Sequence, residues 1–223
     1  MTRRGVMRLL TGLASAGLLT GCDIFGASFR VRVTVEVQTP QGLKTGSSVM
    51  EMSAGTRIAA GTQLTGRYTA GLSRGEAVVI ELPGGPVFML LKVPGDSFEG
   101  QIFDALNGDR KRLTNDDLMG FVRKMGGAWS SYRGEIPRNG WPLIVRFRDI
   151  ADAKSVERVD PQAIGVTRIR LETTRDPVTR AIEKRLAWLR DGGLTLDPEA
   201  GPTTKPTFPQ TVRQRAFSTE IER

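Results

Sequence analysis

The feature that most constrains the fold is a strict alternation of apolar and polar residues that starts at Phe29. Valine stands at every second position from residue 31 to residue 37, and polar residues stand between. Successive side chains of a strand point to opposite faces of a sheet, so this alternation predicts a strand with one buried face. Pro40-Gln41-Gly42 then predicts a turn and residues 43–52 a returning strand, so residues 29–52 are expected to form a β-hairpin.

A second hairpin is predicted from two apolar runs, residues 77–82 and 87–93, joined by Pro83-Gly84-Gly85-Pro86. These runs alternate little, which is typical of strands covered on both faces, so we expect them at the centre of the sheet. Residues 142–148 and 166–172 predict two further strands.

Helices are expected between and after these strands. A helical insertion is predicted near residues 97–126, with a first helix over residues 97–106 and a second capped by Thr114. Asp176 and Pro177 are expected to open a C-terminal helix. Its apolar stripe consists of Val178, Ile182, Leu186 and Leu189. The opposite face is basic and could lie on anionic lipid, although so regular a stripe more often faces a core.

The composition changes after residue 190. Residues 191–223 hold four of the twelve prolines, and we expect them to form a disordered tail. Phe208, Phe217 and Ile221 could order when a partner binds, or the tail could be passive. We therefore predict a single α+β domain over residues 29–190, built on a mainly antiparallel sheet.

The absence of histidine and the single cysteine exclude several chemistries. Without an imidazole the chain cannot use Ser-His-Asp or Cys-His catalysis or bind zinc through histidine. One cysteine cannot form an intrachain disulfide or a CxxC site. The sequence also lacks GxGxxG, P-loop, GxSxG and EF-hand motifs. We therefore predict no cofactor, no metal site and no catalytic residue.

The N-terminal residues predict an export signal. Arg3, Arg4 and Arg8 precede an uncharged apolar stretch, residues 9–20, which is too short to span a bilayer permanently. The stretch ends in Leu19-Thr20-Gly21-Cys22, which resembles the lipobox of bacterial lipoprotein precursors. The resemblance implies cleavage before Cys22 and attachment of diacylglycerol to its thiol. The alternative is an ordinary secretory peptide with a chance cysteine.

Two neighbouring features concern export and sorting. Residues 2–8 resemble a twin-arginine signal, although a general basic region is the favoured interpretation. Asp23 is similar to the residue that retains enteric lipoproteins in the inner membrane. These resemblances imply that residues 1–21 are removed, that residues 22–28 are a lipidated tether, and that the domain faces the periplasm. Removal of residues 1–21 lowers the net charge from +8 to +5. Because the protein is expected to be exported, we expect no nucleic-acid partner despite this charge.

One connection suggests ligand binding. Trp129, Tyr132 and Trp141 lie among arginine, asparagine and glutamate, and their rings could form a surface for a sugar or a peptide. The alternative is that the tryptophans close the core. Glu81, Asp104 and Glu135 are conceivable members of a glycan-cleaving pair, although nothing in their spacing indicates that they converge.

Residues 33–42 and 45–49 are similar to a stretch shared by a group of uncharacterised bacterial proteins, a resemblance that implies no activity. We therefore predict a lipid-anchored envelope protein, most simply a non-catalytic binding or adaptor module for an envelope protein or a glycan. The alternative is a carboxylate-based enzyme acting on a glycan such as peptidoglycan.

Overall fold

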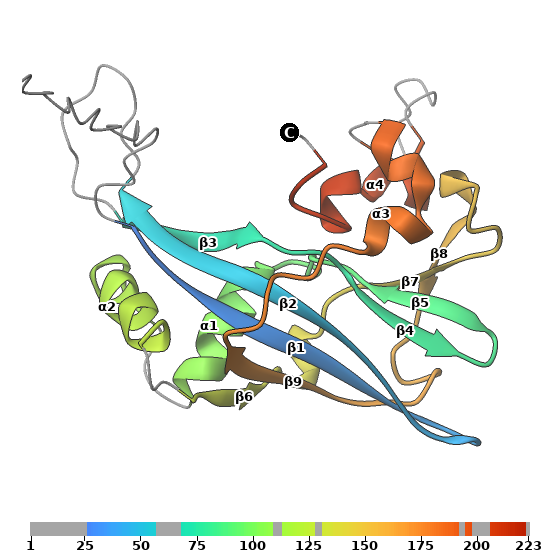
Figure 1. Cartoon of the computed structure of the whole chain (residues 1–223). Coiled ribbons are helices and arrows are strands. Elements are labelled where there is room, and N and C mark those ends of the chain that lie inside the picture. The colour runs from blue at the N-terminus through green and yellow to red at the C-terminus, as the bar shows by residue number, and fades with distance from the viewer. Residues whose placement is uncertain are drawn as a thin grey trace, which may run out of the picture.

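The computed structural model describes residues 26–56, 68–108, 113–127, 131–191, 195–197 and 206–221. These residues form two antiparallel sheets, with helices packed against them (Figure 1). The predicted α+β class and the mainly antiparallel sheet are confirmed. In the described ranges no helix is long and apolar enough to cross a membrane.

The first sheet has five strands in the order β3-β2-β1-β9-β6. They are β1 (Ala27–Thr39), β2 (Gly42–Thr56), β3 (Tyr68–Arg74), β6 (Arg133–Glu135) and β9 (Val166–Thr174). The first predicted hairpin is β1 with β2, and its turn ends at Gly42, whose φ of 103° favours glycine. Every apolar residue of the alternation, from Phe29 to Val37, is buried, because this face of β1 lies against the helical insertion.

The helical insertion consists of α1 (Phe98–Asn107) and α2 (Asn115–Met125). Both begin where the sequence predicts. Ser97 Oγ accepts the Gly100 N–H at 2.9 Å, and Thr114 forms a reciprocal capping box with Asp117. Strand β6 lies close to α1 at Gly134, where a Cβ atom would stand 2.3 Å from the Ala105 carbonyl oxygen. Glycine is therefore required at this crossing.

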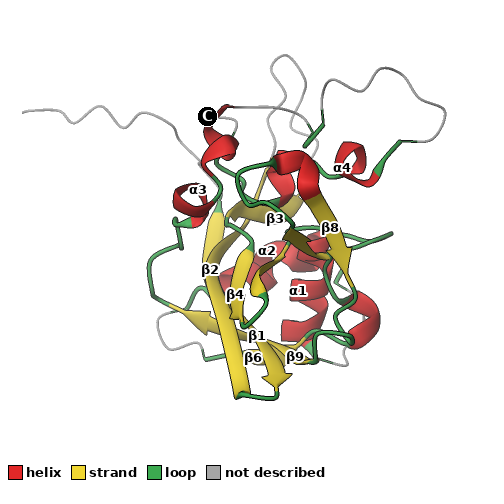
Figure 2. Cartoon of the chain, turned by 90° about the vertical axis from the view of Figure 1, so that its right-hand side faces the viewer, coloured by secondary structure: helices red, strands yellow, loops and turns green. Residues whose placement is uncertain are grey.

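The second predicted hairpin belongs to a separate four-stranded sheet rather than to the centre of the first one. The order is β4-β5-β7-β8, with β4 (Val78–Leu82), β5 (Gly85–Met89), β7 (Ile144–Phe147) and β8 (Val156–Val159). As predicted, both faces of this sheet are covered. Val78 and Ile80 face the first sheet and its helices, whereas Phe88 and Val145 face the C-terminal segments. The sheets meet at Gly46, where a Cβ atom would clash with the Val79 carbonyl, and β4 runs beside β2 in Figure 2.

The C-terminal helix begins later than the sequence predicts. The expected N-cap, Asp176, forms an ion pair with Arg32 of β1 instead, and the segment around it crosses the outer face of the first sheet. There Arg30 Nη1 donates to the Asp176 carbonyl at 3.2 Å, and the Thr179 N–H donates to the Val49 carbonyl at 3.0 Å. These bonds hold the chain extended, so the helix starts only at Ile182.

Short helices cover the outer face of the second sheet, on the side opposite α1 and α2 (Figure 1). They are α3 (Ile182–Arg185), η3 (Ala187–Asp191), α4 (Phe208–Thr211) and η4 (Gln214–Ala216). Two further 3-10 turns lie elsewhere in the chain, η1 (Arg138–Gly140) and η2 (Ala153–Ser155). Ile182, Leu186 and Leu189 are buried in the core under this layer. The expected apolar stripe therefore faces a core rather than lipid.

The expectation of a disordered tail does not hold for residues 206–221. Phe217 is fully buried, and its carbonyl accepts the Ala77 N–H at 2.8 Å. The Ala216 carbonyl accepts the Leu91 N–H at 2.7 Å, so this segment satisfies backbone donors beside the second sheet. The single domain thus extends to these residues, whereas residues 192–194, 198–205 and 222–223 lie outside the described ranges.

Candidate functional site

The predicted lipidation region lies outside the described residues. Leu19, Thr20, Gly21, Cys22 and Asp23 all precede Gly26, with which the described chain begins. Strand β1 starts at the next residue, so the expected tether leads directly into the central strand of the first sheet.

The predicted aromatic surface is only partly described, because Trp129 lies outside the described ranges. Trp141 is 9% exposed, and its Nε1 donates to the Ile136 carbonyl at 3.0 Å. Tyr132 is half-buried, and the Lys124 ammonium lies 5.4 Å from its ring centroid. Trp141 thus packs mainly in the core.

The three candidate carboxylates do not meet. Glu81 of β4 forms an ion pair with Arg185. Asp104 is exposed on α1, and Glu135 is exposed on β6. Because neighbouring Gly134 faces α1, the side chain of Glu135 points to the other face of the sheet, away from Asp104. No group of three or more His, Cys, Asp or Glu residues in the described ranges is placed to hold a metal ion.

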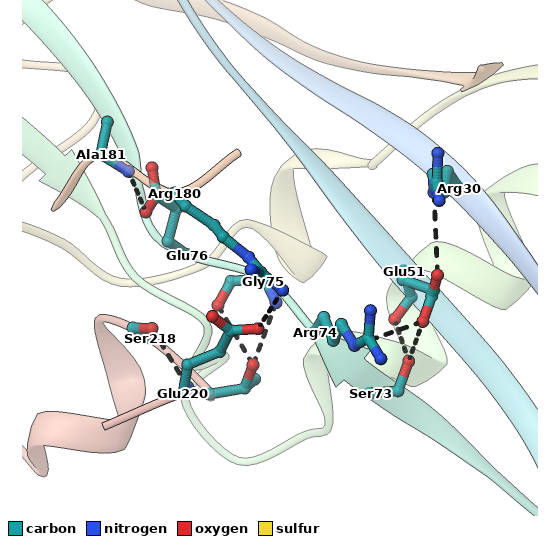
Figure 3. A network of polar contacts seen from close by, with 11 residues as sticks. Arg30, Glu51, Ser73, Arg74, Gly75, Glu76, Arg180, Ala181, Ser218 and Glu220 are labelled. Atoms are coloured by element: carbon teal, nitrogen blue, oxygen red, sulfur yellow. Dashed lines mark hydrogen bonds and ion pairs between the residues drawn. The ribbon is translucent and has the colours of Figure 1, made fainter. Parts of the chain in front are cut away.

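A different carboxylate, Glu76, lies between β3 and β4 and is 5% exposed. Its Oε2 accepts the Ala181 N–H at 2.8 Å and the Ile182 N–H at 3.0 Å. Its backbone carbonyl accepts the Ser48 hydroxyl at 3.0 Å. Figure 3 shows Glu76 beneath Ala181, at the point where the C-terminal segment reaches the sheets. Glu76 therefore connects three segments that are distant in sequence.

Burial raises the pKa of Glu76 above its ordinary value. Removal of water from the carboxylate is the largest cause, and it outweighs the two backbone hydrogen bonds that lower the pKa. The nearby charges of Glu183 and Glu220 raise it further. A perturbed carboxylate of this kind is a candidate acid, so the surrounding space decides whether it could act on a substrate.

The space beside Glu76 is a cavity of about 200 Å³, which Glu183 and Glu220 also line. Glu220 is held by Arg180 at 3.0 Å, and these two side chains point toward each other in Figure 3. This cavity is smaller than most ligand cavities, which usually exceed roughly 300 Å³. A glycan-cleaving pair also needs two carboxyl groups that are free to reach the scissile bond. Glu76 and Glu220 are instead engaged by the protein itself, which indicates a structural role.

A larger groove lies where three turns meet, and we call it the hairpin-tip groove. Its volume is about 520 Å³. Pro40 and Gln41 line it from the first hairpin, Leu82 and Pro83 from the second, and Ile164 from the turn before β9. Figure 1 shows the tip of the β1–β2 hairpin at the far end of the sheet from the start of β1. The groove thus lies at the opposite end of the domain from Gly26.

The hairpin-tip groove is large enough to hold a ligand. Its volume lies within the range of ligand sites, and no described residue that lines it is acidic. Leu43, which follows the first hairpin turn, is 55% exposed but does not line the groove, because it points to the face of β2 opposite Gly46. Comparison of the chain with protein-family models, with curated proteins and with solved structures finds no match.

Proposed function

We propose that this chain is a lipid-anchored bacterial envelope protein that acts as a non-catalytic binding or adaptor module through its hairpin-tip groove. The observation that carries the proposal is the position of this apolar groove at the end of the domain opposite the expected anchor. The lipobox resemblance at Cys22 supports the anchor itself.

Chain length determines how the anchored domain would sit. Gly26 comes four positions after Cys22, and four residue-to-residue steps span at most about 14 Å. Strand β1 has 13 residues, which corresponds to about 43 Å from its start to the hairpin tip. The start of β1 would therefore lie next to the lipid headgroups, and the groove could face outward. Each buried acyl methylene contributes about 0.8 kcal/mol, so two or three chains would hold the protein stably.

The lining of the groove favours a protein segment with apolar side chains as its occupant. Prolines, Leu82 and Ile164 offer apolar contact, whereas a glycan needs many polar partners for its hydroxyl groups. Arg146 is the one charged residue of the described lining, and it pairs with Glu157 at 3.1 Å, so the groove itself best fits a neutral apolar segment.

Photo-crosslinking in living cells tests this function. A photoreactive amino acid at Pro83, an exposed residue that lines the groove, should give one discrete adduct with an envelope protein. The matched control is Ile150, an apolar residue that is 39% exposed and does not line the groove. Equal adducts from both positions, or a glycan adduct from Pro83, would contradict the proposed partner.

A further inference from the structure

A second hollow adjoins the hairpin-tip groove on the other side of the turn at residues 161–165. We call it the two-arginine hollow, because Arg138 and Arg158 both line it. Its volume is about 250 Å³, and Trp141 and Asp160 line it as well. Gln162 lines both the hollow and the groove, so the two spaces are neighbours.

The two arginines lack the carboxylate partners that neighbouring arginines have. Arg146 and Arg148 both pair with Glu157, at 3.1 Å each. Glu157 precedes Arg158 on β8, so their side chains point to opposite faces of the strand. Within the described part of the chain, neither Arg138 nor Arg158 forms an ion pair. Their charge is therefore available to a ligand.

Trp141 holds one of these arginines in place. The guanidinium carbon of Arg138 lies 5.8 Å from the Trp141 ring centroid. The ring itself is fixed by burial and by its hydrogen bond to Ile136. The N–H donors of a guanidinium group lie in the plane of that group. A guanidinium that sits over an aromatic ring therefore keeps these donors free to bind an oxyanion bidentately. Arg138 is thus oriented before any ligand arrives.

The acidic residue of the hollow is already engaged. Asp160 Oδ1 accepts the Gln162 N–H at 3.0 Å, within its own turn. Two guanidinium groups and one carboxylate leave the lining with a net positive charge. The volume suits a single side chain or a small polar group rather than a polymer.

We propose that the two-arginine hollow is an oxyanion-binding site that takes a carboxylate or a phosphate group. Its link to the partner rests on the proposed function: a segment bound in the hairpin-tip groove would place an acidic group beside its apolar residues. The partner would then be recognised by two adjacent features, an apolar stretch and an oxyanion.

Titration by nuclear magnetic resonance tests the site. The full-length Cys22→Ser chain is titrated with sodium acetate and, separately, with sodium phosphate at constant ionic strength. The Arg138 and Arg158 Nε–H signals and the Trp141 indole signal should shift and saturate. Stronger binding of acetate would identify an acidic side chain as the source of the group, and stronger binding of phosphate a phosphorylated one. Linear shifts without saturation for both anions would overturn the proposal.

Matched variants separate this site from general charge effects. Arg138→Gln and Arg158→Gln should each weaken binding at least tenfold, because each removes a charge-assisted contact. Arg148→Gln, which removes an arginine paired with Glu157, should leave binding unchanged. Equal weakening by all three variants would contradict a specific site. Unchanged melting temperatures would show that the variants fold.

A groove variant separates this inference from the proposed function. Pro83→Asp, at an exposed residue that lines the groove but not the two-arginine hollow, should abolish partner capture and leave oxyanion binding intact. Saturable anion binding without any captured partner would refute the proposed function alone. Partner capture that survives in both arginine variants would refute the role of the oxyanion site in partner binding and leave the proposed function standing.

Discussion

Replacement of Glu76 by alanine is expected to lower the free energy of unfolding by about 2 kcal/mol. The buried Ile182 N–H would lose its acceptor, which costs about 1–3 kcal/mol. The Ala181 N–H lies on an exposed residue and can bind water, so its loss costs about 1 kcal/mol. Removal of a buried charge offsets part of this cost.

Glu76→Gln is the informative companion variant. Its amide oxygen can accept the same two N–H groups, and it has no charge to remove from water. We expect its stability at neutral pH to lie within about 1 kcal/mol of the wild type, and clearly above that of Glu76→Ala.

The pH dependence follows from the raised pKa of Glu76. Its pKa is higher in the folded state than the ordinary value of 4.5, so the folded state binds more protons than the unfolded state. Its contribution to stability therefore falls as pH rises from about 4.5 to the raised folded pKa. Glu76→Gln should lack this dependence.

Urea unfolding from pH 4 to pH 8, monitored by tryptophan fluorescence with unchanged m-values, measures both effects. The reasoning is refuted if Glu76→Gln is as unstable as Glu76→Ala. It is also refuted if the difference in stability between the wild type and Glu76→Gln does not change with pH.

Three further variants test the packing. Phe217→Ala should cost about 3–5 kcal/mol in urea unfolding, because Phe217 is fully buried beneath the second sheet; a loss below 1 kcal/mol would contradict its packing. Gly46→Ala should destabilise the contact between the sheets, since the new Cβ would meet the Val79 carbonyl, and an unchanged melting temperature would show that the sheets do not cross there. Thr114→Ala should cost about 1 kcal/mol through loss of the α2 cap, and amide exchange in the first turn of α2 should rise with it.

Local sequence patterns predict the elements whose contacts are local. The alternation from Phe29 and the turn at Gly42 suffice for the first hairpin, because register and burial follow from a period of two. The cap at Thr114 similarly marks the start of α2. The uniformly apolar runs correctly predict strands covered on both faces, although they do not indicate that these strands form a second sheet.

Elements that depend on distant contacts were not predictable in this way. Asp176 looks like a helix cap, but its partner, Arg32, is 144 residues away. Phe217 lies in a proline-containing region without periodicity, and it is ordered by aromatic contacts with Phe88 and Trp188 at 6.3 Å and 5.6 Å between ring centroids. A helix or strand pattern cannot signal such packing.

The hairpin-tip groove and the Glu76 site also depend on contacts between distant parts of the chain. The turns that line the hairpin-tip groove are visible in the sequence, but their meeting depends on how the two sheets cross at Gly46. Glu76 carries a weak local signal, a lone acid directly before an apolar run. Its structural role depends on the hydrogen bond from the Ile182 N–H, and Ile182 is 106 residues away in the sequence.

The most direct test of the central claim is mass spectrometry of the N-terminal peptide from the protein isolated from bacterial membranes. A lipid-anchored envelope protein predicts a mature chain that begins at Cys22 and carries diacylglycerol on its thiol, with Cys22→Ser lost from the membrane fraction. An unmodified Cys22, or a mature chain that begins at another residue and is released into the periplasm, would contradict the account.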